Sequence, residues 1–224
     1  MIWPVMLRSS LRAAAAVVAA FSVTAIGGVA PKSTAEGCPD VELVFARGTA
    51  EPPGLGRVGD ALFAALQPAL GARTLEAYAV NYPASYNFLT TGEGADDARD
   101  HIGWMAGQCP NTRIVLGGYS QGAAAVSMLA GVPPLGDTIG SIGSAPALDP
   151  ALASSVRVVA VFGNPGFRFG TPLSSTGAFA GRAIDLCSPG DPVCTVGARD
   201  RAAHSDYERP PYPGQAAAFI AARV

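Results

Sequence analysis

The chain has 224 residues, with 15 lysines and arginines against 17 aspartates and glutamates and a formal net charge of −2. Hydrophobic residues make up 49% of it, which is enough for a buried core. The slightly acidic balance argues against a nucleic-acid-binding protein, which needs excess basic residues to neutralise phosphates, and no basic run predicts binding to anionic lipid.

The first residues follow the pattern of a secretory signal peptide. Two arginines precede an apolar run over about 13–29, and small residues follow at 33–35. The pattern predicts a signal peptide over residues 1–35 and a protein that is secreted or associated with the cell envelope. Cleavage after Ala30 is an alternative. An uncleaved membrane anchor is less favoured because alanine and glycine dilute the run.

Residues 36–224 are enough for one domain with a substantial core and too few for two. No apolar run in this part approaches the length of a transmembrane helix, so we expect no integral membrane segment after the signal is removed. We expect this single domain to be a monomer.

Short apolar runs alternate along this domain with segments of helical periodicity. The alternation predicts a parallel sheet of five strands with helices on both faces, which is a three-layer α/β/α sandwich built from right-handed crossovers. Residues 130–155 are rich in glycine, proline and serine and predict one helical fragment at most. The expected strands are 41–46, 74–80, 113–117, 156–162 and 182–186, and the expected helices are 58–66, 95–107, 121–129 and 214–222.

All four cysteines follow the predicted signal peptide, and an even number in an exported chain argues for disulfides. Three pairings are possible. Cys187 and Cys194 flank a turn-rich hexapeptide that can close on itself, which leaves Cys38 to pair with Cys109. A zinc site is less favoured because the cysteines lack Cys-x-x-Cys spacing.

The third expected strand ends at a serine flanked by glycines. Gly118, Ser120 and Gly122 form a Gly-x-Ser-x-Gly pattern, and an alanine-rich helical segment follows. The pattern alone is weak in a glycine-rich chain, but the order strand, sharp turn, helix is the context that a nucleophile elbow requires. Ser120 is therefore the candidate nucleophile.

A serine nucleophile needs a base, and the chain contains two histidines. His204 follows the last expected strand, whereas His101 lies in an acidic helical segment before the elbow. Sheets with a nucleophile elbow carry serine, acid and histidine in that chain order, which selects His204 as the base. His101 is predicted to be a surface or helix-capping side chain.

Five aspartates lie between the elbow and His204. Asp191 is the candidate acid because it follows the fifth expected strand inside the loop between Cys187 and Cys194, where a disulfide would hold its carboxylate in place. The alternative is that Asp191 and the following proline only form a turn. The five candidates are Asp137, Asp149, Asp185, Asp191 and Asp200.

Two backbone amides are candidates for an oxyanion hole. Gln121 follows the candidate nucleophile, and Thr49 lies in the loop after the first expected strand, where its hydroxyl can assist.

Together these motifs resemble the cutinase family, especially the cutinase-like serine esterases of mycobacteria and related actinobacteria. The resemblance extends from Cys38 to the last helix, and the disulfide-bounded Gly-Asp-Pro loop is its most specific element. Fungal cutinases have Ser-Thr where this chain has Thr49 and Ala50, so their substrate range does not carry over directly. The segments that carry the resemblance are 45–51, 117–122, 187–194 and His204.

The resemblance implies a lidless α/β-hydrolase in which Ser120 is the nucleophile, His204 the base and Asp191 the acid. It also implies an oxyanion hole at Thr49 and Gln121, and the bridges Cys38–Cys109 and Cys187–Cys194. Its implied activity is hydrolysis of lipid or cutin-like esters with short to medium acyl chains. The sequence itself gives no metal or organic cofactor a role.

Two loops are candidates for the walls of a substrate groove. The loop with Tyr82, Phe88 and Leu89 is aromatic, although the same residues can instead pack as core. The segment 207–213 is stiffened by proline and is a candidate for the opposite wall. Neither loop identifies the substrate, so a phospholipase, lipase or thioesterase remains an alternative, and a surface protein that binds lipid without turnover is a less favoured one.

Overall fold

The computed structural model describes Met1, residues 37–136 and residues 141–224. The predicted signal peptide, beyond its first residue, and Asp137 lie outside the described residues. Residues 37–224 belong to one compact unit. Within the described ranges, no helix combines the length and the apolar character that crossing a membrane requires.

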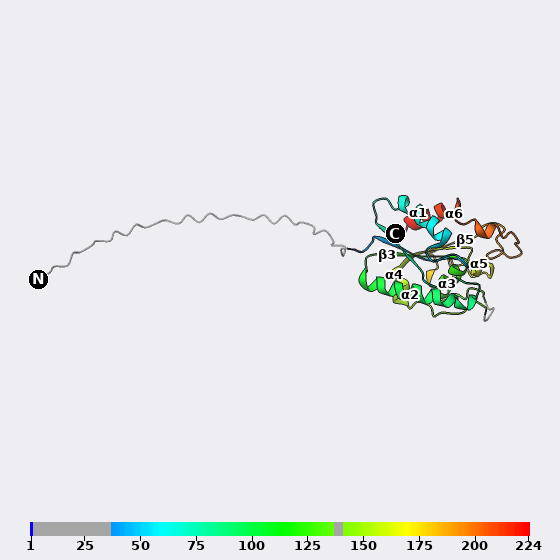
Figure 1. The fold of residues 1–224 in the computed structure, drawn as a ribbon, viewed down its shortest axis with the longest axis horizontal. Coiled ribbons are helices and arrows are strands. Elements are labelled where there is room, and N and C mark those ends of the chain that lie inside the picture. Colours follow the sequence, from blue (N-terminus) through cyan, green and yellow to red (C-terminus); the bar gives the residue numbers. More distant parts are fainter. Residues whose placement is uncertain (2–36, 137–140) are drawn as a thin grey trace. The chain divides into compact units, whose positions relative to one another are not determined.

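A five-stranded sheet forms the middle layer (Figure 1). The four pairs of neighbouring strands are all parallel, which confirms the predicted architecture. The strands lie in the order β2, β1, β3, β4, β5, so the chain leaves β1 toward one edge and then returns to build the other. The strands are β1 (Val41–Ala46), β2 (Leu75–Ala79), β3 (Arg113–Tyr119), β4 (Val156–Phe162) and β5 (Ala183–Leu186).

This reversal places a topological switch between β1 and β3. In open parallel sheets, such a switch opens a crevice beyond the carboxyl ends of the two strands, because their connections run to opposite sides. The loop after β1 contains Thr49, and the turn after β3 contains Ser120. Strand order therefore brings the candidate nucleophile beside one of the candidate oxyanion donors.

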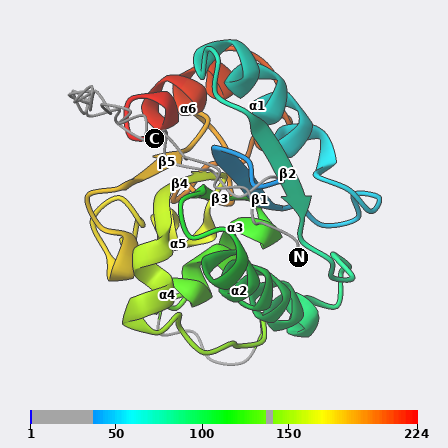
Figure 2. The same cartoon turned by 90° about the vertical axis from the view of Figure 1, so that its left-hand side faces the viewer.

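Helices cover both faces of the sheet (Figure 2). Helices α1 and α6 lie on one face, while α2, α3 and α4 lie on the other. Because side chains of a strand alternate between faces, Leu43 and Phe45 of β1 pack toward α1, and Val44 packs toward α2. The helices are α1 (Gly56–Ala69), α2 (Thr91–Gln108), α3 (Gln121–Leu129), α4 (Pro150–Ser155), α5 (Pro165–Arg168) and α6 (Tyr212–Ala221).

The two shortest helices, α4 and α5, have local start signals. Each begins with a proline, and the residue before it caps the helix: Asp149 accepts a hydrogen bond from the Leu152 amide, and Asn164 accepts one from the Gly166 amide. Helix α4 is the single fragment expected in residues 130–155. Helix α5 was not predicted, because four residues are too few for a helical period.

Both predicted disulfides are confirmed. Cys38–Cys109 joins the chain before β1 to the end of α2, and Cys187–Cys194 closes the loop after β5. The first bridge spans 71 positions and the second only 7, so the second acts on local geometry more than on chain entropy.

Candidate active site

Ser120 lies at a strained turn between β3 and α3. Its φ of 55° is in the left-handed region that non-glycine residues rarely adopt. A side chain at Gly122 would collide with the carbonyl oxygen of Ala46, and a Cβ at Gly118 would lie 2.5 Å from the Gly122 oxygen. The two glycines therefore let the start of α3 approach the end of β1, which is what the Gly-x-Ser-x-Gly pattern predicts.

The three residues predicted as nucleophile, base and acid form one hydrogen-bonded chain. His204 Nε2 lies 2.8 Å from Ser120 Oγ, and His204 Nδ1 lies 2.8 Å from Asp191 Oδ2. His204 belongs to a short 3₁₀ turn, Ala203–Ser205, and Asp191 lies in the disulfide loop. Such a chain can transfer the serine proton to the imidazole while the carboxylate stabilises the resulting imidazolium.

Asp191 is completely buried and has two donors besides His204. The Val193 amide donates to Oδ1 at 2.7 Å, and the Tyr207 hydroxyl donates to Oδ2 at 2.5 Å. Burial by itself would raise the pKa of Asp191, but the hydrogen bonds from His204, Tyr207 and Val193 outweigh it and hold the pKa below its ordinary value. The carboxylate is therefore ionised beside the imidazole.

Tyr207 is a residue of the candidate site that the sequence did not predict as a partner of Asp191. Its ring is fully buried, and its hydroxyl also accepts a hydrogen bond from the Ser188 amide at 2.9 Å. Burial raises its pKa, so the hydroxyl stays protonated and donates to Asp191. Tyr207 thus lies beneath the site and does not form a groove wall, and only its position three residues after His204 hinted at a role.

Tyr119 holds the other side of the histidine loop. Its hydroxyl donates to the His204 carbonyl oxygen at 2.6 Å, and its ring lies 5.2 Å from the imidazole. Burial raises the pKa of Tyr119 to about 12. Because Tyr119 directly precedes Ser120, the elbow positions the histidine loop as well as the serine.

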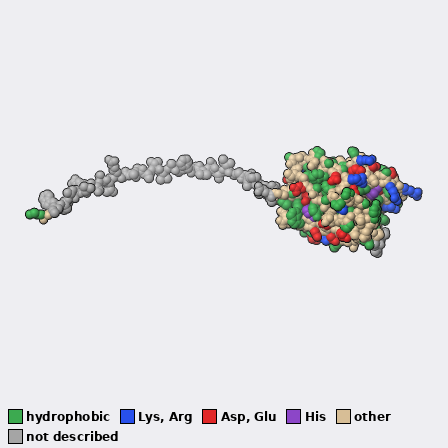
Figure 3. All heavy atoms as spheres, viewed as in Figure 1, with side chains coloured by type: hydrophobic (Ala, Val, Ile, Leu, Met, Phe, Trp, Pro, Cys, Tyr) green, Lys and Arg blue, Asp and Glu red, His purple; other side chains and the backbone are tan. Residues whose placement is uncertain are grey.

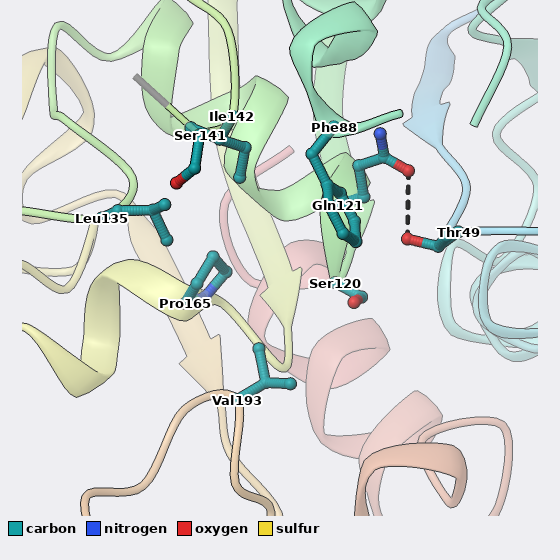
Figure 4. A pocket seen from close by; sticks show the side chains of 9 residues that line it. All are labelled: Thr49, Phe88, Ser120, Gln121, Leu135, Ser141, Ile142, Pro165 and Val193. Carbon is teal, nitrogen blue, oxygen red and sulfur yellow. Dashed lines mark hydrogen bonds between the residues drawn. The ribbon is translucent and has the colours of Figure 1, made fainter. Parts of the chain in front are cut away.

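The two candidate oxyanion residues contact each other (Figure 4). Thr49 Oγ1 donates to Gln121 Oε1 at 3.0 Å, and Gln121 Nε2 donates to Thr91 Oγ1 at 3.0 Å. The Thr49 hydroxyl is thereby directed to Gln121, so the backbone N–H groups of the two residues are the candidate donors to an oxyanion. The side chains set the distance between the loop after β1 and the start of α3.

Arg47 holds the oxyanion loop from beneath. Its guanidinium is buried and donates to the carbonyl oxygens of Glu51, Val80 and Tyr82, at 2.9, 3.2 and 2.6 Å. The Tyr82 hydroxyl donates back to the Arg47 carbonyl oxygen, and Glu51 accepts a hydrogen bond from the Gly48 amide at 2.7 Å. Arg47 lies in the resemblance segment 45–51, but its role was not predicted, because its partners are backbone carbonyl oxygens of its own loop and of the loop after β2.

A mainly apolar cavity of about 260 Å³ opens beside Ser120. Among the three wall candidates, Phe88 lines it, Leu89 is 59% exposed and outside the lining, and Tyr82 is buried as core. Tyr82 therefore packs in the core, as the alternative to a groove wall predicted, and does not contact the cavity. The lining consists of Thr49, Phe88, Ser120, Gln121, Leu135, Ser141, Ile142, Pro165 and Val193 (Figure 4).

The remaining histidine and aspartate candidates lie in other interactions. The prediction that His101 is a surface or helix-capping side chain is wrong: it lies in the middle of α2, its side chain is 12% exposed and stacks on Tyr78, and its Nε2 lies 3.0 Å from a Glu42 carboxylate oxygen. Asp149 caps α4, Asp185 accepts from the Asn164 side chain, and Asp200 accepts from the Ala202 amide. In the described part of the chain, no three His, Cys, Asp or Glu side chains are arranged to hold a metal ion.

The cutinase family model matches residues 37–224. The chain belongs to the cutinase family. Its curated relatives include the probable carboxylesterase Culp3 of Mycobacterium tuberculosis, 47% identical over 220 residues, which are 97% of this chain and 82% of the relative. The phospholipase Culp4 of the same species is 45% identical over 94% of this chain and 89% of the relative.

Solved structures of the same fold agree. A Trichoderma reesei cutinase in complex with a phosphonate inhibitor matches with a TM-score of 0.64 and 33% identity, over 82% of this chain and 75% of that one. An acetylxylan esterase matches with a TM-score of 0.69 and 25% identity, over 83% and 99%. This cutinase-family protein is thus a serine carboxylic-ester hydrolase with an α/β-hydrolase fold.

Proposed function

We propose that this protein is a secreted esterase that hydrolyses carboxylic esters of short to medium acyl chain through an acyl-enzyme on Ser120. The observation that carries the proposal is the chain of 2.8 Å hydrogen bonds from Ser120 through His204 to the buried Asp191, at the edge of an apolar cavity. A nucleophile, a base and an oriented acid in that order are the groups that acyl transfer needs.

In the first half-reaction, Ser120 Oγ attacks the ester carbonyl carbon while its proton passes to His204 Nε2. The carbonyl oxygen becomes an oxyanion, which accepts hydrogen bonds from the backbone N–H groups of Thr49 and Gln121. His204 then gives the proton to the departing alkoxide, the C–O bond breaks, and the acyl group stays on Ser120.

In the second half-reaction, His204 takes a proton from water, whose oxygen attacks the acyl carbon. The tetrahedral intermediate uses the same oxyanion donors, and its collapse returns the proton to Ser120 Oγ and releases the acid. Asp191, held by Tyr207 and the Val193 amide, keeps the imidazole in one orientation through both halves.

The size of the cavity supports the acyl preference. At about 260 Å³ it is just below the range of about 300–1,000 Å³ for drug-sized ligands, and above the roughly 150 Å³ that holds a benzene molecule. Phe88, Leu135, Ile142 and Val193 supply apolar walls for a chain of that size.

Secretion is supported by the two disulfides, which persist in oxidising compartments. The signal peptide over residues 1–35 is part of the same proposal, with 36–224 as the mature catalytic domain, either released or kept on the envelope, and monomeric. N-terminal sequencing of the exported protein tests the cleavage site, and size-exclusion chromatography with light scattering tests the monomer.

The test of the activity is the hydrolysis rate of p-nitrophenyl esters from acetate to palmitate by the mature protein, with Ser120→Ala as the matched blank. We expect turnover to peak at short or medium chains and to vanish in the variant. Equal rates for wild type and variant would mean that Ser120 is not the nucleophile and would favour a protein that binds lipid without turnover.

The second candidate function is phospholipid or other lipid hydrolysis by the same residues. It is favoured by the 45% identity to a relative named as a phospholipase. A maximum at long acyl chains, or release of fatty acid from phospholipid at a rate comparable to that from simple esters, would select it. A thioesterase would instead prefer matched thioesters.

A further inference from the structure

Exposed apolar side chains gather around the mouth of the cavity. Phe88 lines the cavity and is 39% exposed, and Leu89 beside it is 59% exposed. Pro165, the first residue of α5, also lines the cavity, and the exposed side chains of Phe167 and Phe169 lie at the end of this helix. Val196 follows the disulfide loop, whose Val193 also lines the cavity. We call α5 with Phe169, the disulfide loop and residues 195–201 the rim. Within residues 37–136 and 141–224, the exposed large apolar side chains are Tyr86, Phe88, Leu89, Trp104, Phe167, Phe169 and Val196.

Three exposed arginines lie on one side of the same rim. Arg168 at the end of α5 donates to the Pro192 carbonyl oxygen at 2.8 Å, which joins α5 to the disulfide loop. The Asp200 amide donates to the Gly190 carbonyl oxygen at 3.1 Å, which brings the segment of Arg199 and Arg201 against that loop as well. Figure 3 shows basic side chains gathered at one end of the domain, where Figure 1 draws the loop between β5 and α6.

These three arginines have no carboxylate partner within 4.0 Å among the described residues. Two other arginines near the site pair with carboxylates: Arg57 with Glu51 and Glu208, and Arg209 with Asp206. The carboxylate of Asp200, between Arg199 and Arg201 in the chain, accepts hydrogen bonds from the Ala202 and Ala203 amides and offsets one of the three positive charges. The rim is therefore cationic although the whole chain carries a net charge of −2.

We propose that this rim docks on a bilayer surface that contains anionic phospholipid, with Phe167, Phe169 and Val196 in the interface and Arg168, Arg199 and Arg201 on the lipid phosphates. Apolar area and electrostatic attraction add in such binding, and both are present on one surface here. Charge complementarity selects this occupant, since an apolar rim alone would suit a neutral surface equally. The inference rests on the proposed function, because it makes a membrane the place where Ser120 meets its ester.

The basic residues come from two segments about 30 positions apart, so no basic run in the sequence revealed them. An arginine held near an anionic surface strengthens binding about fivefold. Loss of two should therefore weaken binding about 25-fold, and added salt should weaken it further, because screening shortens the reach of surface charges.

The test measures partitioning of the mature protein onto vesicles, in the Ser120→Ala background so that lipid is not consumed. Vesicles of phosphatidylcholine alone are compared with vesicles containing 30% phosphatidylglycerol. The variant is Arg199→Gln with Arg201→Gln, two side chains without hydrogen bonds in the described structure. The control for charge is Arg113→Gln with Arg157→Gln, two exposed arginines at the opposite end of the sheet, of which Arg157 donates to the Arg223 carbonyl oxygen at 2.8 Å.

We expect tighter binding to the phosphatidylglycerol vesicles, a loss of about 25-fold in the rim variant on those vesicles only, and little change in the control. A Phe167→Ser and Phe169→Ser variant should weaken binding to both vesicle types. Equal partitioning onto both vesicles, or equal losses in rim variant and control, would overturn the proposal. A third result would also overturn it: binding of the protein to soluble polyglutamate that is unchanged in the Phe167→Ser and Phe169→Ser variant. The partner would then be an acidic macromolecule and not a bilayer.

Restoring Ser120 in the rim variant gives an independent check. Its hydrolysis of a soluble butyrate ester should equal that of the wild type, which verifies folding. Vesicle binding with no esterase activity would refute the proposed function alone, and esterase activity without anionic preference would refute the docking alone.

Discussion

Tyr207→Phe tests whether the buried carboxylate of Asp191 depends on a donor beyond His204. The change removes the hydroxyl that donates to Asp191 Oδ2 at 2.5 Å and accepts from the Ser188 amide at 2.9 Å. A hydrogen bond to a charged group contributes about 1.5–3 kcal/mol, and a buried amide left without an acceptor costs about 1–3 kcal/mol. We expect the free energy of unfolding at pH 7 to fall by about 3 kcal/mol.

The size of this loss should depend on pH in a direction that Asp191 sets. A carboxyl with a depressed pKa in the folded protein stabilises the fold above its unfolded pKa of about 3.9, and loses that contribution as the pH falls through the folded pKa. Without the Tyr207 donor, the folded pKa of Asp191 moves back toward the unfolded value. The difference between wild type and variant should therefore be full at pH 7 and shrink below about pH 4.

Urea denaturation at pH 7 and at pH 3.5 measures the effect. Tyr212→Phe is the matched control, because its ring lies 5.0 Å from that of Tyr207 and its hydroxyl has no hydrogen bond among the described residues. The reasoning is refuted if Tyr207→Phe costs the same at both pH values, or if the control loses as much. A soluble-ester assay should also record a several-fold lower kcat with unchanged KM, since the change loosens His204 without touching the cavity.

Thr49→Ala should lower kcat about 10²-fold, because the Thr49 hydroxyl holds the oxyanion loop against Gln121. Thr49→Ser retains a hydroxyl and should keep most of the wild-type kcat. Equal kcat values for the two variants would contradict this. Replacing Cys187 and Cys194 with serine should cost about 2.5 kcal/mol of stability and lower kcat. Replacing Cys38 and Cys109 should cost about 4 kcal/mol and leave kcat unchanged. Urea denaturation and ester hydrolysis of the two variants distinguish these effects. Arg57→Gln removes a half-exposed arginine that pairs with Glu51 of the oxyanion loop and with Glu208 after the histidine loop. It should change stability by less than about 1 kcal/mol but lower kcat up to tenfold, and a kcat equal to that of the wild type would mean that this bridge does not position the loops. Hydrolysis of a soluble ester should slow as the pH falls, because a protonated imidazole cannot accept the serine proton; an undiminished rate down to about pH 4 would exclude His204 as the base.

Much of the fold was predictable because the pattern of apolar residues within a short segment determines whether that segment forms a strand or a helix. The strands 41–46 and 156–162 and the helix 121–129 begin and end where their apolar patterns do. Helix α2 starts four residues earlier than predicted, at Thr91, because its first turn contains glycines that a periodicity search discounts. The sequence predicted parallel strands but not their order, since order depends on which strands pack together.

The candidate site divides in the same way. Ser120 was predictable from its elbow, His204 from its place after the elbow in a chain with two histidines, and Asp191 from the disulfide loop that contains it. Tyr207 was not, because its role arises from a hydrogen bond to a residue 16 positions away that only folding creates. The burial of Tyr82 was equally hidden, since an aromatic loop has the same sequence whether it packs inward or lines a groove.

The sequence by itself determined the local chemistry of this protein: the strained serine turn, the strand periods, and the cysteine spacing that closes a loop. The tertiary structure decided which distant groups meet, namely the donors to Asp191, the buried Arg47 beneath the oxyanion loop, and the arginine rim. Local patterns act through the geometry of a few neighbouring residues. Contacts between loops depend instead on strand order and packing, which no short stretch of the chain contains.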